Sequence, residues 1–190
     1  MLLFAGAFMF TLTATSDKIR DRMVREAPHT LDGMAYMSYA RYWDKDLEMD
    51  LSQDALAIEW MQKNVKGSPV IVEANTSEYR WGSRYTIYTG LPGVVGWNWH
   101  QRQQRAVLAN EEVQQRVDQV GDFYQSTGRI EVEKFLDRYD VRYIIVGQLE
   151  KAYYDPVGLM KFEAWNGDLW QEVYRDRDTV IYEVRDRGVQ

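Results

Sequence analysis

The sequence has no cysteine and only two histidines, and its apolar N-terminal run is short. The lack of cysteine excludes disulfides and thiolate metal sites, and it leaves the redox compartment open. His100 has no second histidine or cysteine at ligand spacing, so we expect no metal site. A basic excess is also missing, because the net charge is −6. That charge argues against a nucleic-acid-binding protein.

Catalytic and cofactor motifs are missing as well. "GSRYTIYTG" lacks the Gly-Lys-Ser/Thr ending of a P-loop, "GLPGVVG" precedes a predicted strand, and no Gly-x-Ser-x-Gly elbow occurs. Glu73 and Glu150 lie at the ends of predicted strands and could do acid–base work, but surface or paired carboxylates are commoner. We therefore expect no cofactor and no catalytic residue in this chain.

The composition is that of a globular chain, with 190 residues of which 45% are hydrophobic and 27% charged. We expect an apolar stub with a charged flank over residues 1–23 and a single α/β domain over residues 24–190. The stub "MLLFAGAFMFTL" is about half the length of roughly 20 residues that a spanning helix needs. From the residues alone it is either the end of a transmembrane helix or an apolar element that packs on the domain.

Hydrophobic periodicity predicts an α/β fold with a central, mostly parallel sheet, flanking helices and a C-terminal antiparallel hairpin at one edge. The predicted helices cover residues 53–65, with Ser52 as N-cap, 110–125 and 129–139. The predicted strands cover residues 69–74, 93–97, 141–147, 168–176 and 179–185. Residues 27–52 show no clear period and are predicted to be an irregular connector.

One segment differs chemically from the rest of the chain. Residues 79–105, here called the acid-free segment, contain four arginines, six aromatic residues and no Asp or Glu, so they carry +4 and the remainder carries −10. Ligands of open parallel sheets bind at the carboxyl ends of the strands, where this segment is predicted to lie. A basic, aromatic surface of this kind suits an anion attached to an apolar or sugar-like group.

Candidates for substrate binding are Glu73, Arg84, Trp99, His100, Arg102 and Arg105. Arg102 and Arg105 are three residues apart and could clamp one phosphate or carboxylate on a helical turn. Pairing of the arginines with acids elsewhere in the chain is the alternative. Trp97 is expected in the core at the end of a strand. A hydrogen-bonded loop position is the alternative for His100.

Three stretches, "TLDGMAYM" (30–37), "TGLPGVVGWNWHQRQQR" (89–105) and "YIIVGQLEKAYYDPVGLMKF" (143–162), resemble the C-terminal part of multi-pass membrane proteins of the YYY type (Chlor_Arch_YYY). Those proteins are similar to the GT-C superfamily of polytopic glycosyltransferases, which use lipid-phosphate-linked sugars. The family pattern has an acid after the histidine and a tryptophan before the first arginine of the pair, whereas here Gln101 follows His100 and Gln103 intervenes before Arg105.

This resemblance implies that the stub is the end of the last transmembrane helix and that the domain is membrane-attached on the extracytoplasmic face. The catalytic acid of GT-C enzymes lies in an early loop that this chain lacks, so the chain would not catalyse alone. It would recognise the acceptor or the lipid-phosphate sugar, with the membrane part of the parent protein as its partner. The alternative is a non-catalytic module that docks on a partner domain or on anionic membrane headgroups.

Overall fold

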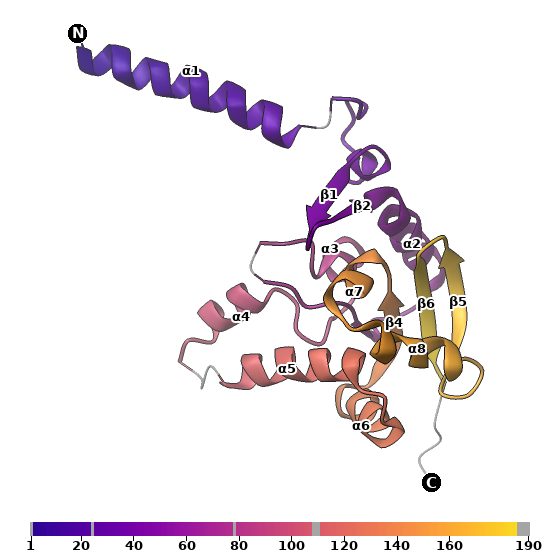
Figure 1. The fold of residues 1–190 in the computed structure, drawn as a ribbon. Helices are drawn as coiled ribbons and strands as arrows, with labels where there is room; N and C mark the ends of the chain where they lie inside the picture. The colour runs from indigo at the N-terminus through magenta and orange to yellow at the C-terminus, as the bar shows by residue number, and fades with distance from the viewer. Residues whose placement is uncertain (1, 24, 78, 108–110, 186–190) are drawn as a thin grey trace.

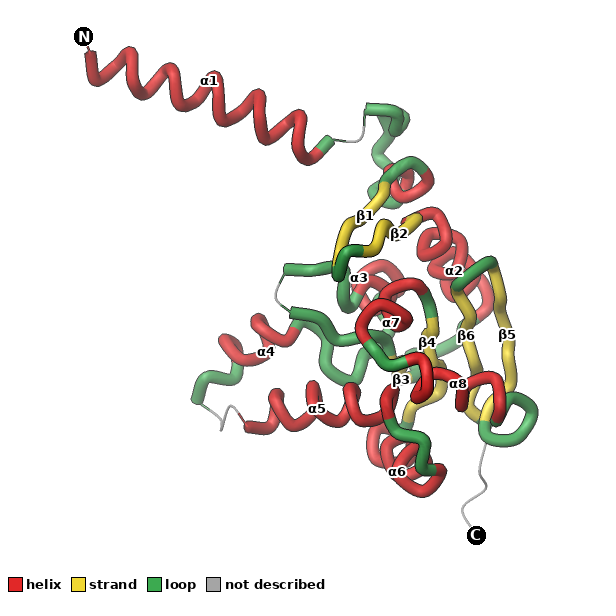
Figure 2. Tube along the Cα trace, viewed as in Figure 1, coloured by secondary structure: helices red, strands yellow, loops and turns green. Residues whose placement is uncertain are grey.

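A mixed four-stranded sheet forms the centre of the computed structural model, which describes residues 2–23, 25–77, 79–107 and 111–185 (Figures 1 and 2). The strand order is β3 (Val70–Val72), β4 (Val141–Val146), β6 (Thr179–Val184) and β5 (Trp170–Asp176). β3 and β4 run parallel, whereas β6 is antiparallel to both β4 and β5. The predicted α/β class and the hairpin at the sheet edge are confirmed.

The predicted strand over residues 93–97 is wrong, so the sheet has one parallel pair and is mixed instead of mostly parallel. Gly93 makes only an isolated parallel bridge with Ile71. Gly96 has a φ of +70°, a conformation that ends an extended run and favours glycine. The chain then turns directly into a helix at Asn98.

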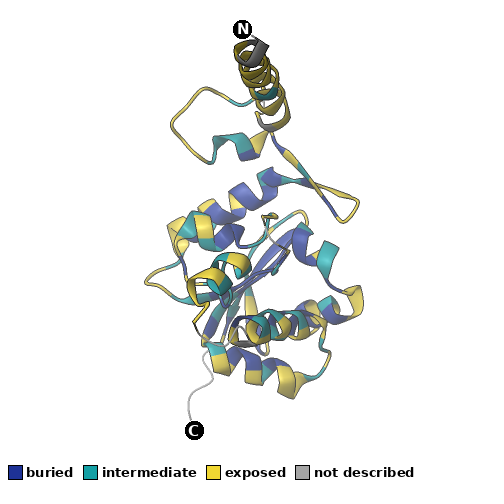
Figure 3. Ribbon diagram, turned by 90° about the vertical axis from the view of Figure 1, so that its left-hand side faces the viewer, coloured by how far each residue is buried: buried dark blue, intermediate teal, exposed yellow. Residues whose placement is uncertain are grey.

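Helices cover both faces of the sheet (Figure 3). Alternate strand residues point to opposite faces, so Ile144 lies in one buried cluster and Ile145 in the other. The first cluster also holds residues of α5 (Glu111–Gln125), α6 (Arg129–Tyr139) and α8 (Pro156–Ala164). The second holds residues of α2 (Leu51–Asn64), α3 (Arg84–Thr89) and the 3₁₀ helix η1 (Ala35–Ser38). Two short helices, α4 (Asn98–Gln104) and α7 (Gln148–Tyr153), follow β3 and β4 in the chain.

The connector over residues 27–52 is more regular than predicted. Besides η1 it contains an antiparallel hairpin of β1 (Arg41–Asp44) and β2 (Leu47–Asp50). Lys45 and Asp46 both have positive φ, as a tight hairpin turn requires, but neither is the glycine that usually marks such a turn. Asp50, not Ser52, is the N-cap of α2, because its carboxylate accepts a hydrogen bond of 3.0 Å from the Ser52 amide.

The N-terminal segment forms one helix, α1 (Leu2–Arg22), that extends away from the sheet (Figure 1). Large apolar side chains of this helix are exposed, namely those of Phe4, Phe8, Met9, Phe10 and Leu12. In this structure the segment therefore does not pack on the domain. Among the described residues, no helix is both long enough and apolar enough to cross a membrane.

Candidate functional site

Arg84 lies at the centre of a buried charge cluster beneath the acid-free segment. Its side chain is 1% exposed and is surrounded by the carboxylates of Asp54, Glu73 and Glu150. Nη1 and Nη2 donate to the two oxygens of Glu150 at 3.2 and 3.0 Å. Nε lies 2.9 Å from Oδ2 of Asp54, and Nη1 lies 3.7 Å from Oε2 of Glu73. Burial by itself would lower the pKa of Arg84, but the carboxylates of Asp54 and Glu150 raise it well above the ordinary arginine value, so the guanidinium stays charged inside the protein.

Glu73 directly follows β3 and holds the first turn of α3. Its carboxylate accepts hydrogen bonds from the amides of Tyr85 and Thr86 at 3.0 and 2.9 Å, and from the Thr86 hydroxyl at 2.9 Å. Burial raises the pKa of Glu73, while Arg84 and these hydrogen bonds act in the opposite direction. Glu73 therefore joins a strand end to a helix start.

Glu150, in the helix that follows β4, also holds backbone amides at the ends of strands. Besides Arg84, it accepts hydrogen bonds from the amides of Ala74 and Gly147 at 2.7 and 2.8 Å. Its side chain is fully buried. Each oxygen thus has one backbone and one guanidinium donor, so this carboxylate joins Arg84 to the backbone after β3 and after β4.

Glu73 and Arg84 were predicted to bind substrate, but the structure places both inside the domain. Their contacts link α2, β3, α3 and α7, and so they fix the path of the acid-free segment over the carboxyl ends of β3 and β4. We therefore assign them a positioning role and leave them out of the exposed surface.

Asp54, which the sequence reasoning missed, completes this cluster. Its two oxygens accept hydrogen bonds from the Trp81 indole at 2.7 Å and from the Tyr85 hydroxyl at 3.1 Å. A signal was present in the sequence, because Asp54 lies on the same helical face as the buried Ile58 and Met61.

An aromatic cluster lies at the surface of the acid-free segment. The rings of Trp97 and His100 are stacked with centroids 4.9 Å apart, and Tyr79 meets both edge-on at 6.3 and 6.0 Å. Tyr79, Trp97 and Trp99 are 70%, 39% and 40% exposed. Trp97 was expected in the core, but it precedes α4 at the surface because the predicted strand before it does not form. His100 thus lies in α4 and contacts these rings, whereas the predicted alternative was a hydrogen-bonded position in a loop.

The two arginines of α4 and its C-cap point to different neighbours. Arg102 donates to the Gln114 side chain on α5, and Gln114 in turn donates to Asp118 at 2.7 Å. Arg105 lines a small cavity between α4 and α5 together with Arg116. Arg102 and Arg105, predicted to act together, thus have different neighbours, and Arg116 shares a cavity lining with Arg105. Sequence spacing gave no signal for Arg116, because it belongs to a different helix.

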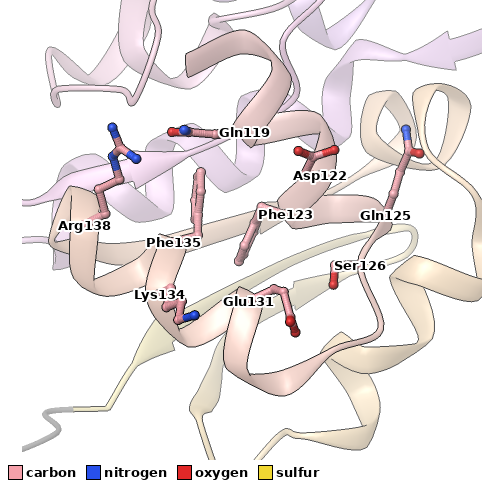
Figure 4. A pocket seen from close by; sticks show the side chains of 9 residues that line it. All are labelled: Gln119, Asp122, Phe123, Gln125, Ser126, Glu131, Lys134, Phe135 and Arg138. Atoms are coloured by element: carbon pink, nitrogen blue, oxygen red, sulfur yellow. The ribbon is translucent and has the colours of Figure 1, made fainter. Parts of the chain in front are cut away.

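A larger pocket, of about 590 Å³, lies elsewhere, between α5 and α6 (Figure 4). The stacked rings of Phe123 and Phe135 lie in its middle, with Arg138 and Lys134 on one side and Asp122 on the other. No residue of the acid-free segment lines it. Within the described ranges, no group of three or more His, Asp or Glu residues is arranged to hold a metal ion.

Comparison with known proteins finds similarity to a solved structure at low sequence identity. No family model matches the chain, and no curated protein matches it. A solved structure that it resembles is the C-terminal globular domain of an oligosaccharyltransferase from Archaeoglobus fulgidus, with a TM-score of 0.46 and 17% sequence identity over 73% of this chain and 100% of that chain. We transfer no residue role from that structure.

Proposed function

We propose that this chain is the globular domain of a GT-C-like polytopic membrane glycosyltransferase and that it helps to recognise the acceptor or the lipid-phosphate-linked sugar donor. In this proposal the domain lies on the extracytoplasmic face, attached to the membrane part of its parent protein, and does not catalyse alone. The observation that carries the proposal is the surface cluster of Tyr79, Trp97, Trp99 and His100 at the start of α4, the helix that ends at the exposed Arg105.

The chemistry of this surface fits such a ligand. Exposed aromatic faces pack against the apolar face of a sugar or a prenyl chain, and Tyr and Trp keep a polar group at the rim. A guanidinium group binds a phosphate with two parallel hydrogen bonds. No described side chain forms a hydrogen bond or ion pair with Arg105, so its guanidinium needs no rearrangement to receive an anion. The acid-free segment also presents no carboxylate that would repel the ligand.

The N-terminal helix supports the membrane part of the proposal. The apolar side chains of its first half are exposed, and its second half carries Asp17, Lys18, Arg20 and Asp21. An apolar surface next to a charged flank is expected where a chain leaves a bilayer. We therefore propose that the first half of α1 lies in the membrane.

A second candidate function is docking without ligand recognition. The same exposed tryptophans and Arg105 would suit a partner domain or anionic headgroups, since aromatic residues and arginine are enriched in binding surfaces. Charge reversal of Arg102 and Arg105 separates the two candidates. Loss of vesicle binding with the ligand response intact would favour docking.

The proposal is tested by two-dimensional NMR of the 190-residue chain, titrated with a water-soluble short-chain prenyl-phosphate sugar. We expect saturable shifts in the indole signals of Trp97 and Trp99 and in the amides of α4. Shifts confined to other parts of the domain, or no saturable shift, would overturn it.

A further inference from the structure

A cavity of about 100 Å³ lies where α4 meets α5. Gln101 and Arg105 reach it from the α4 side, and Arg116 reaches it from α5. The rest of the wall is formed by Gly93, Val94, Val95 and Val113. The cavity has room for about three water molecules or for one tetrahedral anion.

The charge around this cavity is one-sided. Two guanidinium groups and one carboxamide line it, and no Asp or Glu does. Two cations that face one space repel each other unless an anion lies between them. Without an anion in the cavity, the charges of the two arginines therefore destabilise this arrangement.

Neither arginine is held by an ion pair within the described part of the chain. Arg116 donates to the Val94 carbonyl with a long hydrogen bond of 3.4 Å, and its guanidinium lies 5.7 Å from the centre of the Tyr139 ring. These contacts orient the Arg116 side chain and leave most of its five donors unused. Arg105 is exposed at the C-terminal end of α4.

We propose that this cavity is a phosphate-binding site in which Arg105 and Arg116 bind the phosphate oxygens and the Gln101 amide donates a further hydrogen bond. The site rests on the proposed function and deepens it: the phosphate is the monoester or diester group that links the lipid to the sugar. The aromatic cluster of Tyr79, Trp97 and His100 lies at the N-terminal end of α4. In this proposal it contacts the attached sugar. The three valines offer the apolar wall along which the first carbons of the lipid run.

The test uses inorganic phosphate and the whole 190-residue chain. The arginine side-chain Nε–Hε signals are followed by NMR at constant ionic strength, in the wild type and in the Arg105→Gln and Arg116→Gln variants. We expect saturable shifts of the Arg105 and Arg116 signals and a roughly tenfold weaker affinity in each variant, the effect of losing one charge-assisted contact.

Arg138→Gln is the matched control. Arg138 is exposed, and its guanidinium lies over the same Tyr139 ring at the same 5.7 Å, but it does not line the cavity. The control should therefore bind phosphate as the wild type does. Equal weakening in all three variants would reveal binding to general positive charge and would overturn the site, as would the absence of a saturable shift. The backbone spectrum of each variant shows whether the fold is retained.

A second arm compares inorganic phosphate with a short-chain prenyl phosphate. Tighter binding of the prenyl ester, with shifts of the Val94, Val95 and Val113 methyl signals, supports the lipid as the source of the phosphate. Equal affinities without methyl shifts would assign the site to free phosphate and overturn the link to a lipid. If phosphate binds here but the prenyl-phosphate sugar leaves Trp97 and Trp99 unshifted, the proposed function fails and the phosphate site stands. The reverse result removes the phosphate site alone.

Discussion

Arg84 and Glu150 form a two-point ion pair inside the protein, with donor–acceptor distances of 3.2 and 3.0 Å. The pair ties the start of α3, which lies within the acid-free segment, to the turn after β4 from which α7 begins. Asp54 and Glu73 also face the same guanidinium, so one cation serves three carboxylates. The position of the exposed site thus depends on a charge cluster that no ligand reaches.

Removal of Arg84 should therefore destabilise the protein more than removal of one acid. Arg84→Met leaves three buried carboxylates without their cation and is expected to cost about 3–5 kcal/mol of unfolding free energy. Glu150→Gln leaves Asp54 and Glu73 to balance the arginine and should cost less. Urea denaturation measures both. The Arg175→Gln variant of an exposed ion pair is the control, with an expected loss of at most about 1 kcal/mol. An equal loss in Arg84→Met and Arg175→Gln would contradict the account.

Lys161 should make stability depend on pH. Its ammonium group is buried against Phe162 and donates to the carbonyls of Tyr124 and Gly158 at 2.7 and 2.8 Å, with burial lowering its pKa to about 7. Between pH 7 and the ordinary lysine pKa of about 10.4, the unfolded chain binds more protons than the folded one. The unfolding free energy therefore rises with pH, and this contribution is lost as pH falls toward 7.

The measurement is urea denaturation at several pH values from 7 to 9.5. The wild type should gain stability relative to Lys161→Met by up to about 1.4 kcal/mol per pH unit. Parallel pH profiles of the two proteins would show that Lys161 keeps an ordinary pKa.

Two helical glycines should respond to alanine in opposite directions. A Cβ on Gly158 would lie 2.5 Å from the Tyr124 carbonyl oxygen, where α8 crosses the end of α5. Gly121, within α5, has open space at the same position. We expect Gly158→Ala to lower stability by about 1–3 kcal/mol and Gly121→Ala to raise it by up to about 1 kcal/mol. Thermal unfolding of both variants checks this, and a stabilised Gly158→Ala would show that α8 does not pack so closely.

The two tryptophans Trp97 and Trp170 should differ sharply in their effect on stability. Trp170 is fully buried and its indole donates to the Phe162 carbonyl at 2.8 Å, whereas Trp97 is 39% exposed. Trp170→Ala should cost about 3–5 kcal/mol, as for other buried aromatic residues. Trp97→Ala should cost about 1 kcal/mol or less, as is usual at a surface. Comparable losses in urea denaturation would mean that Trp97 belongs to the core.

The sequence predicted those elements whose periodicity comes from burial on one face. In β6, Val180 and Tyr182 pack on one side and Ile181 on the other, and the alternation was visible in the residue order. The helices α5 and α6 were visible for the same reason. The hairpin of β1 and β2 was not, because Lys45 and Asp46 adopt positive φ without a glycine to mark the turn.

The sequence indicated which segment holds the candidate site, but it did not show which residues of that segment are exposed. The absence of acids over residues 79–105 singled out a basic, aromatic segment of the chain. It did not separate Arg84, which is buried among carboxylates, from Arg105, which is exposed. That distinction depends on Asp54 and Glu150, which approach from other elements of the fold. That Arg105 and Arg116 line the same cavity likewise depends on how α4 lies against α5.

The central claim is that the aromatic cluster of the acid-free segment binds a phosphate-linked sugar. Isothermal titration calorimetry of a short-chain prenyl-phosphate sugar, with the wild type, Trp97→Ala and Trp43→Ala, tests it most directly. Trp43 is also an exposed tryptophan but lies on β1, outside the segment. We predict that Trp97→Ala weakens binding roughly tenfold, in line with the loss of one stacked ring, and that Trp43→Ala binds as the wild type does. Equal affinity of all three proteins, or no binding by the wild type, would contradict the claim.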